Sequence, residues 1–305
     1  MASMTVIRAG MLTTIQDLGR WGQQHLGVPV AGPMDWYSHR LANAALGNRP
    51  DAAALEITLM GPELACDADV ACAIAGAEFD VTAGDRRVRN LEPFLLRAGE
   101  RLRFGNRLEG SRATLAVNGG FSVPLVLGSR STSLTSRLGP LDGRAVRIGD
   151  VLPIGAPSVV PRRQPARPLP LPRGGARLRV IMGPHDNRFS DMARKTFSRA
   201  RYMVTPDSNR MGYRLDGPRL EYAERKDMLS DATPMGSLQV PPSGWPILLM
   251  ADRQTTGGYP KIATVITADL PLAGQLSPGD WIEFEPCSRA AAIEALRRRE
   301  GALTG

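Results

Sequence analysis

Short apolar segments separated by turn residues recur along almost the whole chain, and they limit the possible folds more than any other feature of the sequence. Each is rich in Val, Ile and Leu and is bounded by Gly, Pro, Asn or Asp, a pattern typical of β-strands. The clearest are residues 70–75, 79–82, 101–104, 113–117, 178–182, 247–250, 262–267 and 281–284. Because amphipathic helices do not alternate with them, the pattern favours antiparallel barrels or sandwiches over a doubly wound sheet.

Helical pattern is present in only three places. Residues 36–46 follow Asp35, which can cap a helix, and precede the stop signal Gly47-Asn48. The other two predicted helices are residues 191–199 and 290–299. The last ends in three consecutive arginines, whose charge suits a helix C-terminus.

A segment rich in proline and arginine divides the chain. Residues 156–176 contain six prolines, a composition that favours extended chain and cannot form a packed core. A length of 305 residues also corresponds to about two domains. We therefore predict a first subdomain over 1–155, a linker over 156–176, a second subdomain over 177–288, and a C-terminal helix and tail over 289–305.

The two halves share short motifs in the same order, which indicates an internal duplication. The matched pairs are Gly61-Pro62 with Gly217-Pro218, Gly119-Gly120 with Gly257-Gly258, Gly149-Asp150 with Gly279-Asp280, and Arg20-Trp21-Gly22 with Arg210-Met211-Gly212. The expected fold class is therefore mainly β, with tandem barrel-like subdomains and a few short helices.

The formal net charge of +8 does not predict nucleic-acid binding. Five arginines and no acidic residue fall in residues 151–177, so most of the excess lies in the linker. Aromatic residues make up 5% of the chain, too few for a base-stacking surface. We expect no nucleic-acid partner.

The sequence contains no apolar run of the 18 to 20 residues that cross a bilayer, and no basic-then-apolar leader. It therefore predicts a cytoplasmic protein without membrane contact. Cys66, Cys72 and Cys287 have no paired spacing and are expected to be buried free thiols.

Common catalytic signatures are missing. The sequence has no G-x-x-x-x-G-K-[ST] phosphate loop, no G-x-S-x-G elbow and no H-E-x-x-H. His25, His39 and His185 lack ligand spacing, so no metal site is predicted.

The most informative stretch is the polar loop 251–261, which follows the apolar run 247–250. Strand ends that lead into polar loops often place side chains at a binding site. Gly257-Gly258 can present successive backbone N–H groups to an anion or a carbonyl oxygen, and Thr255, Thr256 and Lys261 add donors. The alternative is a turn held by its own hydrogen bonds.

Three further polar clusters are candidates. Asp17 and Arg20 could form an internal ion pair or a substrate clamp. Asp35 lies near Asn43, although a helix cap is the simpler role for Asp35. Arg210 could bind a carboxylate bidentately.

These clusters resemble a known family, the biotin-dependent carboxyltransferase-like proteins that include the C subunit of 5-oxoprolinase, also called KipA and known historically as allophanate hydrolase subunit 2. The resemblance extends from about residue 6 to 284. The motifs that carry it are residues 13–20, 32–35, 42–43, 47–48, 55–56, 61–62, 118–120, 127–129, 210–212, 239–241 and 252–261.

The resemblance implies two cyclophilin-like β-barrel subdomains. It also implies one component of a heteromeric enzyme that hydrolyses 5-oxo-L-proline to L-glutamate with ATP, together with a KipI-like B subunit plus an A subunit. One alternative is a carboxyltransferase-type role in urea or amide metabolism. Another is a regulator that binds a KipI-like kinase inhibitor. Fold alone does not decide among them.

Residue types suggest roles in amide chemistry, which builds negative charge on a carbonyl oxygen. We expect Asp252, Asp17 and Thr256 to be catalytic, with the two aspartates moving a proton or holding the amide N–H. The remaining candidates are substrate-binding: Gln16, Arg20, Asp35, Asn43, Arg210, Gln254, Thr255, Gly257, Gly258, Tyr259 and Lys261. Arg210 or Lys261 would bind a substrate carboxylate. ATP is expected to serve the complex without binding this chain, and biotin enters only under the carboxyltransferase alternative.

Overall fold

The computed structural model describes residues 2–157, 167–223 and 228–304. The chain divides into two compact units. Unit 1 comprises Met1–Trp21, Val30–Leu171 and Gly301–Gly305, and unit 2 comprises Gly22–Pro29 and Pro172–Glu300. Of the linker expected at 156–176, residues 158–166 lie outside the described part.

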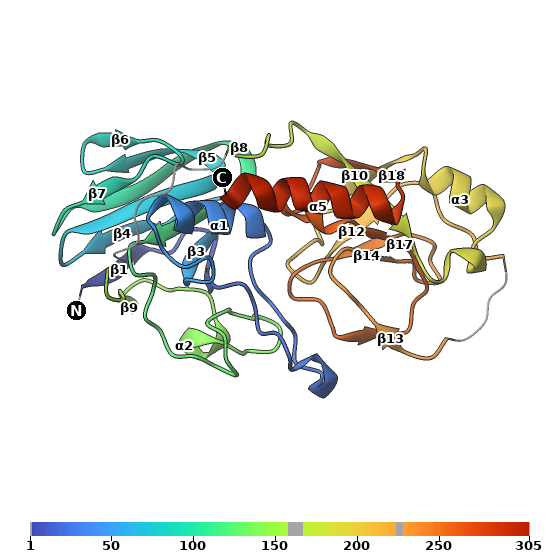
Figure 1. The fold of residues 1–305 in the computed structure, drawn as a ribbon, viewed down its shortest axis with the longest axis horizontal. Coiled ribbons are helices and arrows are strands. Elements are labelled where there is room, and N and C mark those ends of the chain that lie inside the picture. The colour runs from blue at the N-terminus through green and yellow to red at the C-terminus, as the bar shows by residue number, and fades with distance from the viewer. Residues whose placement is uncertain (1, 158–166, 224–227, 305) are drawn as a thin grey trace. The chain divides into compact units, whose positions relative to one another are not determined.

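Unit 1 is built on a nine-stranded sheet that curls around its own core (Figure 1). Its main path runs β2-β3-β8-β4-β1-β9, while β5 pairs with β6, β7 and β8. The strands are β1 (Ser3–Arg8), β2 (Leu12–Gln16), β3 (Ala54–Thr58), β4 (Glu63–Cys66), β5 (Val70–Ala83), β6 (Arg86–Val88), β7 (Phe94–Leu96), β8 (Arg101–Val117) and β9 (Val151–Pro153).

Two long strands replace four short predicted ones. Residues 70–75 and 79–82 belong to the single strand β5, and residues 101–104 and 113–117 both belong to β8. The β5–β8 register shifts three times between Gly76 and Val81. These bulges bend the pair without ending it, which is why polar and glycine positions inside the strands read as turns in the sequence.

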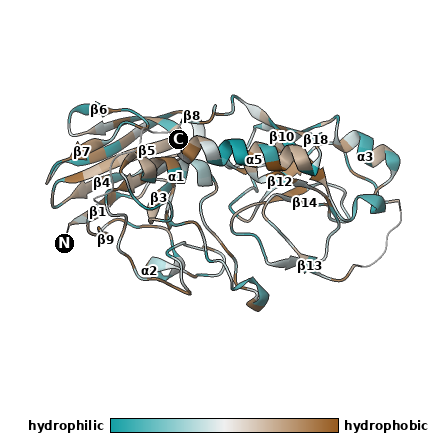
Figure 2. Cartoon of the chain, in the orientation of Figure 1, coloured by the Kyte–Doolittle hydropathy of each residue, from teal (hydrophilic) through white to brown (hydrophobic). Residues whose placement is uncertain are grey.

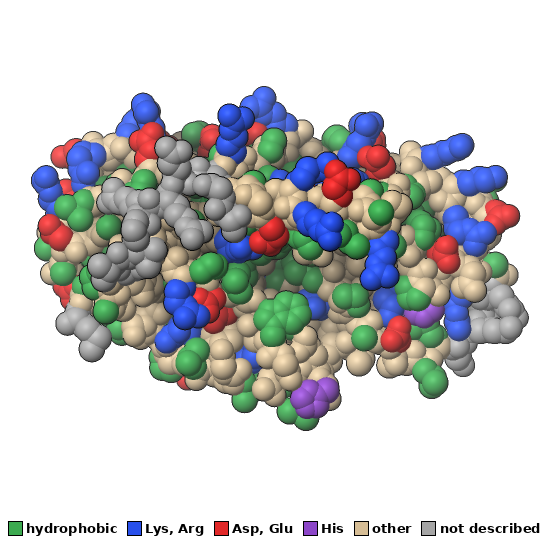
Figure 3. All heavy atoms as spheres, in the orientation of Figure 1, with side chains coloured by type: hydrophobic (Ala, Val, Ile, Leu, Met, Phe, Trp, Pro, Cys, Tyr) green, Lys and Arg blue, Asp and Glu red, His purple; other side chains and the backbone are tan. Residues whose placement is uncertain are grey.

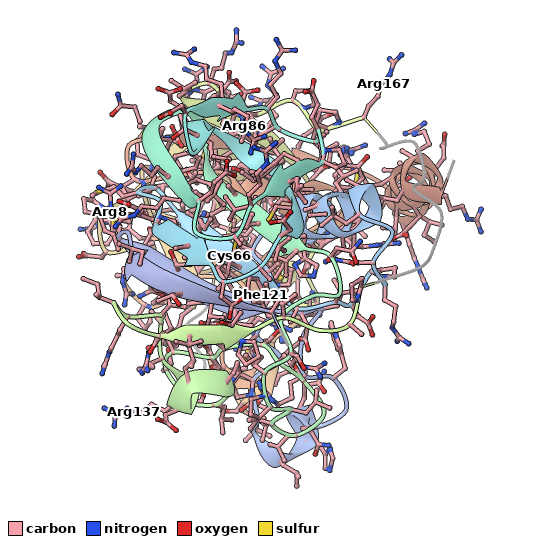
Figure 4. All side chains as sticks on the ribbon, turned by 90° about the vertical axis from the view of Figure 1, so that its left-hand side faces the viewer. Arg8, Cys66, Arg86, Phe121, Arg137 and Arg167 are labelled. Atoms are coloured by element: carbon pink, nitrogen blue, oxygen red, sulfur yellow. The ribbon has the colours of Figure 1, made fainter. Side chains whose placement is uncertain are left out.

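The core of unit 1 consists of side chains enclosed by this sheet. Met4, Ile57, Leu102 and Phe104 are all buried there. Figure 2 shows the corresponding apolar stretches on the strands. In the end view of Figure 4, Cys66 and Phe121 lie well inside the unit, and both are buried.

Unit 2 is a closed seven-stranded barrel in the order β10-β17-β14-β15-β12-β11-β18. The parallel pairing of β10 with β18 closes it, and the other neighbours are antiparallel. The strands are β10 (Gly175–Met182), β11 (Arg201–Val204), β12 (Gly212–Asp216), β14 (Ser237–Gln239), β15 (Ile247–Leu249), β17 (Lys261–Val265) and β18 (Trp281–Pro286). Separately, β13 (Asp231–Ala232) pairs with β16 (Thr256–Gly257).

The three predicted helices are confirmed as α1 (Trp36–Ala45), α3 (Asp191–Phe197) and α5 (Arg289–Thr304). The other helical elements are short: η1 (Gln24–Leu26), α2 (Pro140–Gly143), η2 (Asp186–Arg188), η3 (Thr267–Asp269) and α4 (Leu270–Gly274). Within the described residues, no helix is both long and apolar enough to cross a membrane.

The predicted fold class, mainly β with tandem cyclophilin-like barrel subdomains, is confirmed, with one difference between the units. Unit 2 closes into a barrel, whereas the main path of the unit 1 sheet ends at β2 and β9. The thiol prediction holds for Cys66 and Cys72, but Cys287 is only partly buried because it lies in the connection between β18 and α5. On the face drawn in Figure 3, basic and acidic side chains are interspersed.

Candidate functional site

In unit 2 the predicted polar loop forms one arm of a small sheet. It leaves β15 with Met250 to Arg253 buried, and then becomes partly exposed from Gln254 to Tyr259. Thr256 pairs with Ala232 and Gly257 with Asp231. The pairing with β13 therefore holds the loop, together with a turn hydrogen bond from the Arg253 N–H to the Met250 carbonyl.

The two glycines of this loop differ in their surroundings. A Cβ on Gly257 would lie 2.5 Å from Gln239 Nε2, so the close packing there requires glycine. A Cβ on Gly258 would meet nothing nearer than 3.8 Å. Within the described residues the backbone N–H of Gly258 donates no hydrogen bond. Gly258 can thus offer that N–H to a bound oxygen.

Arg210 and Asp252 form a buried bidentate ion pair. Arg210 Nε donates to Asp252 Oδ2 at 3.1 Å, and Nη2 donates to Oδ1 at 3.0 Å. The backbone N–H of Asp252 also donates to the Arg210 carbonyl. Both carboxylate oxygens of Asp252 are therefore engaged by one guanidinium, which joins the start of the loop to the segment before β12.

Lys261 is buried at the start of β17 and is bound from two sides. Its Nζ donates to Asp231 Oδ2 at 2.5 Å and to the Ala232 carbonyl at 2.6 Å. The ammonium lowers the pKa of Asp231 by hydrogen bonding. The Lys261 backbone N–H donates to His185 Nδ1, so a neutral His185 carries its proton on Nε2. Burial, together with the Lys261 charge, lowers the pKa of His185.

Side-chain amides connect the remaining loop candidates. Gln254 Nε2 donates to Gln239 Oε1 at 3.2 Å, and Gln239 Nε2 donates to the Tyr259 carbonyl at 3.4 Å. The Tyr259 side chain itself is exposed. The Thr255 carbonyl accepts from the Thr233 N–H, which extends the β13–β16 pairing.

In unit 1, Asp17 fixes a serine-rich segment at the end of β2. Its Oδ1 accepts from the hydroxyls of Ser129 and Ser131, both at 2.6 Å, and its Oδ2 accepts from the Arg130 N–H at 2.5 Å. The Gly19 N–H donates to Oδ1 at 2.9 Å. A carboxylate that accepts four hydrogen bonds is strongly stabilised in place.

Arg20 and Gln16 hold the same serine-rich segment. Arg20 donates to the Val126 and Ser131 carbonyls, both at 2.8 Å. Gln16 Nε2 donates to the Thr132 carbonyl at 3.0 Å. Asp17 and Arg20 therefore both hold the segment 126–132.

Asp35 caps α1, as predicted. Its Oδ1 accepts from the Ser38 N–H at 2.9 Å, and its Oδ2 accepts from the Ser38 hydroxyl at 2.6 Å. Asn43 Nδ2 lies 3.2 Å from His39 Nε2 and donates to the Ala52 carbonyl. Burial lowers the pKa of His39 to about 4, against the opposing effect of the Asp17 charge.

The predicted site residues thus form two sets, one in each unit. Unit 1 brings together Gln16, Asp17 and Arg20 around one segment, with Asp35 and Asn43 on α1. Unit 2 brings Arg210 to Asp252, and the loop 254–261 to β13. Among the described residues, no group of three or more His, Cys, Asp or Glu could hold a metal ion.

Several polar residues of these sets were missed by sequence reasoning: His39, Ser129, Ser131, His185, Asp231, Gln239 and Arg253. Ser129 and Gln239 lie in segments that carry the family resemblance, and Arg253 lies in the loop itself, so a signal was present for these three. Asp231 and His185 meet Lys261 only through the fold.

Fold and site together define a mainly β protein that gathers buried ion pairs and hydrogen-bond donors at strand ends, an arrangement suited to carbonyl chemistry. The chain belongs to the family described as carboxyltransferase domain, subdomain A and B, which matches residues 26–286.

Relatives of known name fall into two groups. The chain is 39% identical to the C subunit of 5-oxoprolinase from Escherichia coli, with 97% of this chain and 95% of that protein covered. It is 37% identical to the protein of the same name from Haemophilus influenzae, with 94% and 92% covered. The crystal structure of K. lactis urea amidolyase has a TM-score of 0.93 and 32% identity, but the chain covers only 20% of that protein.

Proposed function

We propose that this chain is the C subunit of a heteromeric 5-oxoprolinase that hydrolyses 5-oxo-L-proline to L-glutamate with ATP. The observation that carries the proposal is the end-to-end correspondence with proteins named as the C subunit of 5-oxoprolinase, at 39% identity over 95% of the E. coli protein. Its expected partners are a KipI-like B subunit plus an A subunit.

The unit 2 loop supports this proposal chemically. Opening a lactam develops negative charge on the carbonyl oxygen, and preorganised donors stabilise that charge. The Gly258 N–H and the exposed Thr256 side chain are available on one short segment that β13 holds in place. We assign them contact with the substrate carbonyl.

The acidic candidates hold other groups of the protein in place. Asp252 uses both oxygens to bind Arg210, and Asp17 uses both to hold residues 129–131. We therefore propose that Asp252, Arg210 and Asp17 are positioning residues, while Thr256 and Gly258 touch the substrate. The hydrogen bond between Gln254 and Gln239 would hold the loop against β14.

We place ATP use on the partner chains, because the sequence holds no phosphate-binding loop. This chain then contributes binding and orientation of the substrate, without contact to ATP or biotin. The complex is expected in the cytoplasm, where ATP is supplied.

A second candidate is carboxyl transfer to a urea-type amide. It is favoured by the TM-score of 0.93 to K. lactis urea amidolyase. The same loop donors would polarise the urea carbonyl, and biotin would be delivered by a separate protein. Because the chain spans a fifth of that enzyme, the activity of the whole urea amidolyase is the weaker proposal.

The test is reconstitution of the chain with its A and B partners. We expect ATP-dependent release of glutamate from 5-oxo-L-proline that disappears when any one chain is omitted. Urea and biotin are assayed in parallel on the same preparation. An assembled complex that is inactive on 5-oxo-L-proline but consumes urea would replace the first proposal with the second.

A further inference from the structure

The polar loop of unit 2 contains one buried cation that its neighbours do not neutralise. Asp252 is paired with Arg210, and Asp231 is paired with Lys261. The remaining charged side chain, Arg253, is 8% exposed and forms no ion pair with a carboxylate in the described part of the chain. Counted over the described residues, the loop and its contacts therefore carry one positive charge that no ion pair neutralises.

Backbone carbonyls hold the Arg253 guanidinium in place. Its Nε donates to the Thr233 carbonyl at 2.6 Å, and its Nη1 lies at 3.5 Å from the Met250 carbonyl. Nη2 makes no hydrogen bond to a described residue. It is also not one of the buried side-chain atoms that lack a partner, so it keeps contact with solvent. One edge of the guanidinium is thus fixed, and the other edge can reach a ligand.

Burial of this charge is costly without a counterion. Desolvation lowers the pKa of Arg253 to about 10, although the Asp252 charge acts in the opposite direction. A bound anion would reverse that effect and recover the lost solvation. Surface arginines of this chain show the contrast, since Arg177, for example, pairs with Glu283 at 2.7 Å.

We propose that Arg253 binds the carboxylate of the substrate, in the role that the sequence suggested for Arg210 or Lys261. Those two cations are already engaged by Asp252 and Asp231, whereas Arg253 has an open edge. The ligand class is a small monoanionic carboxylate. A doubly charged phosphate is disfavoured for two reasons. Asp252 lies in the loop and Asp231 in the strand paired with it, so both carboxylates would repel the phosphate. Only one edge of one cation is available to neutralise it.

This inference rests on the proposed function for the identity of the substrate, but not for the presence of the anion site. Arg253 precedes Thr255, Thr256 and Gly258 by only a few residues. Arg253 Nε donates to the Thr233 carbonyl, and the Thr233 N–H donates to the Thr255 carbonyl, so the guanidinium lies beside the segment that carries the loop donors. A ligand whose carboxylate meets Arg253 would then present its carbonyl to that segment. 5-Oxo-L-proline carries both groups on one ring.

The first experiment measures binding by the full chain in calorimetric titrations with 5-oxo-L-proline, acetate and bicarbonate, and with 2-pyrrolidinone as a lactam that lacks the carboxylate. We expect Arg253→Gln to weaken carboxylate binding by about 10- to 100-fold, the effect of losing a charged hydrogen bond. Binding of 2-pyrrolidinone should stay unchanged. Arg253→Lys should recover part of the affinity, and Arg214→Gln, at an exposed arginine of the same unit, should bind as the wild type does.

Equal loss of 5-oxo-L-proline and 2-pyrrolidinone binding in a folded Arg253→Gln protein would reduce Arg253 to a structural residue and overturn the inference. So would carboxylate binding that is unchanged in both variants, or a folded wild-type chain that binds none of the anions. If the wild type binds acetate or bicarbonate through Arg253 but not 5-oxo-L-proline, the anion site stands and the proposed substrate falls. If Arg253→Gln does not fold, Arg253→Lys alone supplies the comparison.

Discussion

At the scale of single residues, the Arg210–Asp252 pair gives the clearest prediction. Asp252→Asn removes the charge that two Arg210 nitrogens contact in a buried setting. Breaking a buried ion pair from one side costs about 3–5 kcal/mol. We expect the free energy of unfolding, measured with denaturant, to fall by about that amount.

The matched control for this substitution is Asp80→Asn. Asp80 and Arg87 are exposed and 4.0 Å apart, so the control should change stability by less than about 0.5 kcal/mol. An Asp252→Asn protein as stable as the wild type would show that the pair does not hold the loop. Asp252 would then be free for the proton-transfer role that the sequence suggested.

His39 predicts how stability depends on pH. Its pKa in the folded protein is about 4 and its ordinary value is 6.5. Between these values the unfolded chain binds a proton that the folded chain does not, so stability falls as pH drops from 6.5 to 4. The full loss is about 3 kcal/mol, since each pKa unit corresponds to about 1.36 kcal/mol.

Denaturant melts between about pH 4 and 7 check this prediction. His39→Gln should flatten most of the slope, with a remainder from His185, whose pKa is also lowered. His25→Gln, at an exposed position, should keep the wild-type slope. Identical slopes in all three proteins would mean that His39 does not stay neutral when folded.

At the scale of elements, the β13–β16 pairing predicts that the two loop glycines differ in their tolerance of a side chain. Gly257→Ala places a methyl group 2.5 Å from Gln239 Nε2 and should displace that buried amide. Overpacking of this kind costs about 1–3 kcal/mol. Gly258→Ala, with 3.8 Å of clearance, should leave thermal stability nearly unchanged. Equal melting temperatures for the two variants would argue against the close packing of β16 on β14.

The helices and strands also show which parts of the fold could be predicted from the sequence alone. The helices at 36–46, 191–199 and 290–299 and the mainly β class were predictable, because capping signals and strand patterns are local. The continuity of β5 and β8 was not, since bulges keep a strand paired across residues that read as turns. The polar character of the loop 251–261 could also be recognised, because it is local. Its pairing with Asp231–Ala232 could not be predicted, because that pairing joins segments far apart in the sequence.

The candidate site shows the same limit. Residue type alone made Arg210 and Lys261 equal candidates for anion binding, and it overlooked Arg253 in between. What separates them is which cation a carboxylate already neutralises, and that depends on residues 30 to 42 positions away in the sequence. Partners at such separations leave no periodic signal.

At the scale of the whole molecule, the duplicated motifs fall in units that differ in closure. The repeat Gly119-Gly120 lies in unit 1 and Gly257-Gly258 in unit 2. A Cβ on Gly119 would lie 2.4 Å from the Gly155 carbonyl oxygen, whereas Gly257 lies against a side-chain amide. The repeat thus keeps the glycine requirement while its surroundings diverge. In unit 1 the Gly119 N–H donates to Asn48 Oδ1 and the Gly120 N–H to the Val117 carbonyl, whereas the Gly258 N–H has no acceptor among the described residues.

The charge of the whole chain supports a final prediction. The net charge is +8, yet on the face of Figure 3 basic side chains are interspersed with acidic ones, and Arg177 and Arg201 both pair with Glu283. Binding to DNA requires several unpaired cations that together displace counterions from phosphates. We expect a labelled duplex of about 20 base pairs to show no anisotropy change at about 150 mM salt with micromolar protein. A dissociation constant tighter than about 10⁻⁶ M, the upper range of non-specific binding, would contradict the expectation of no nucleic-acid partner.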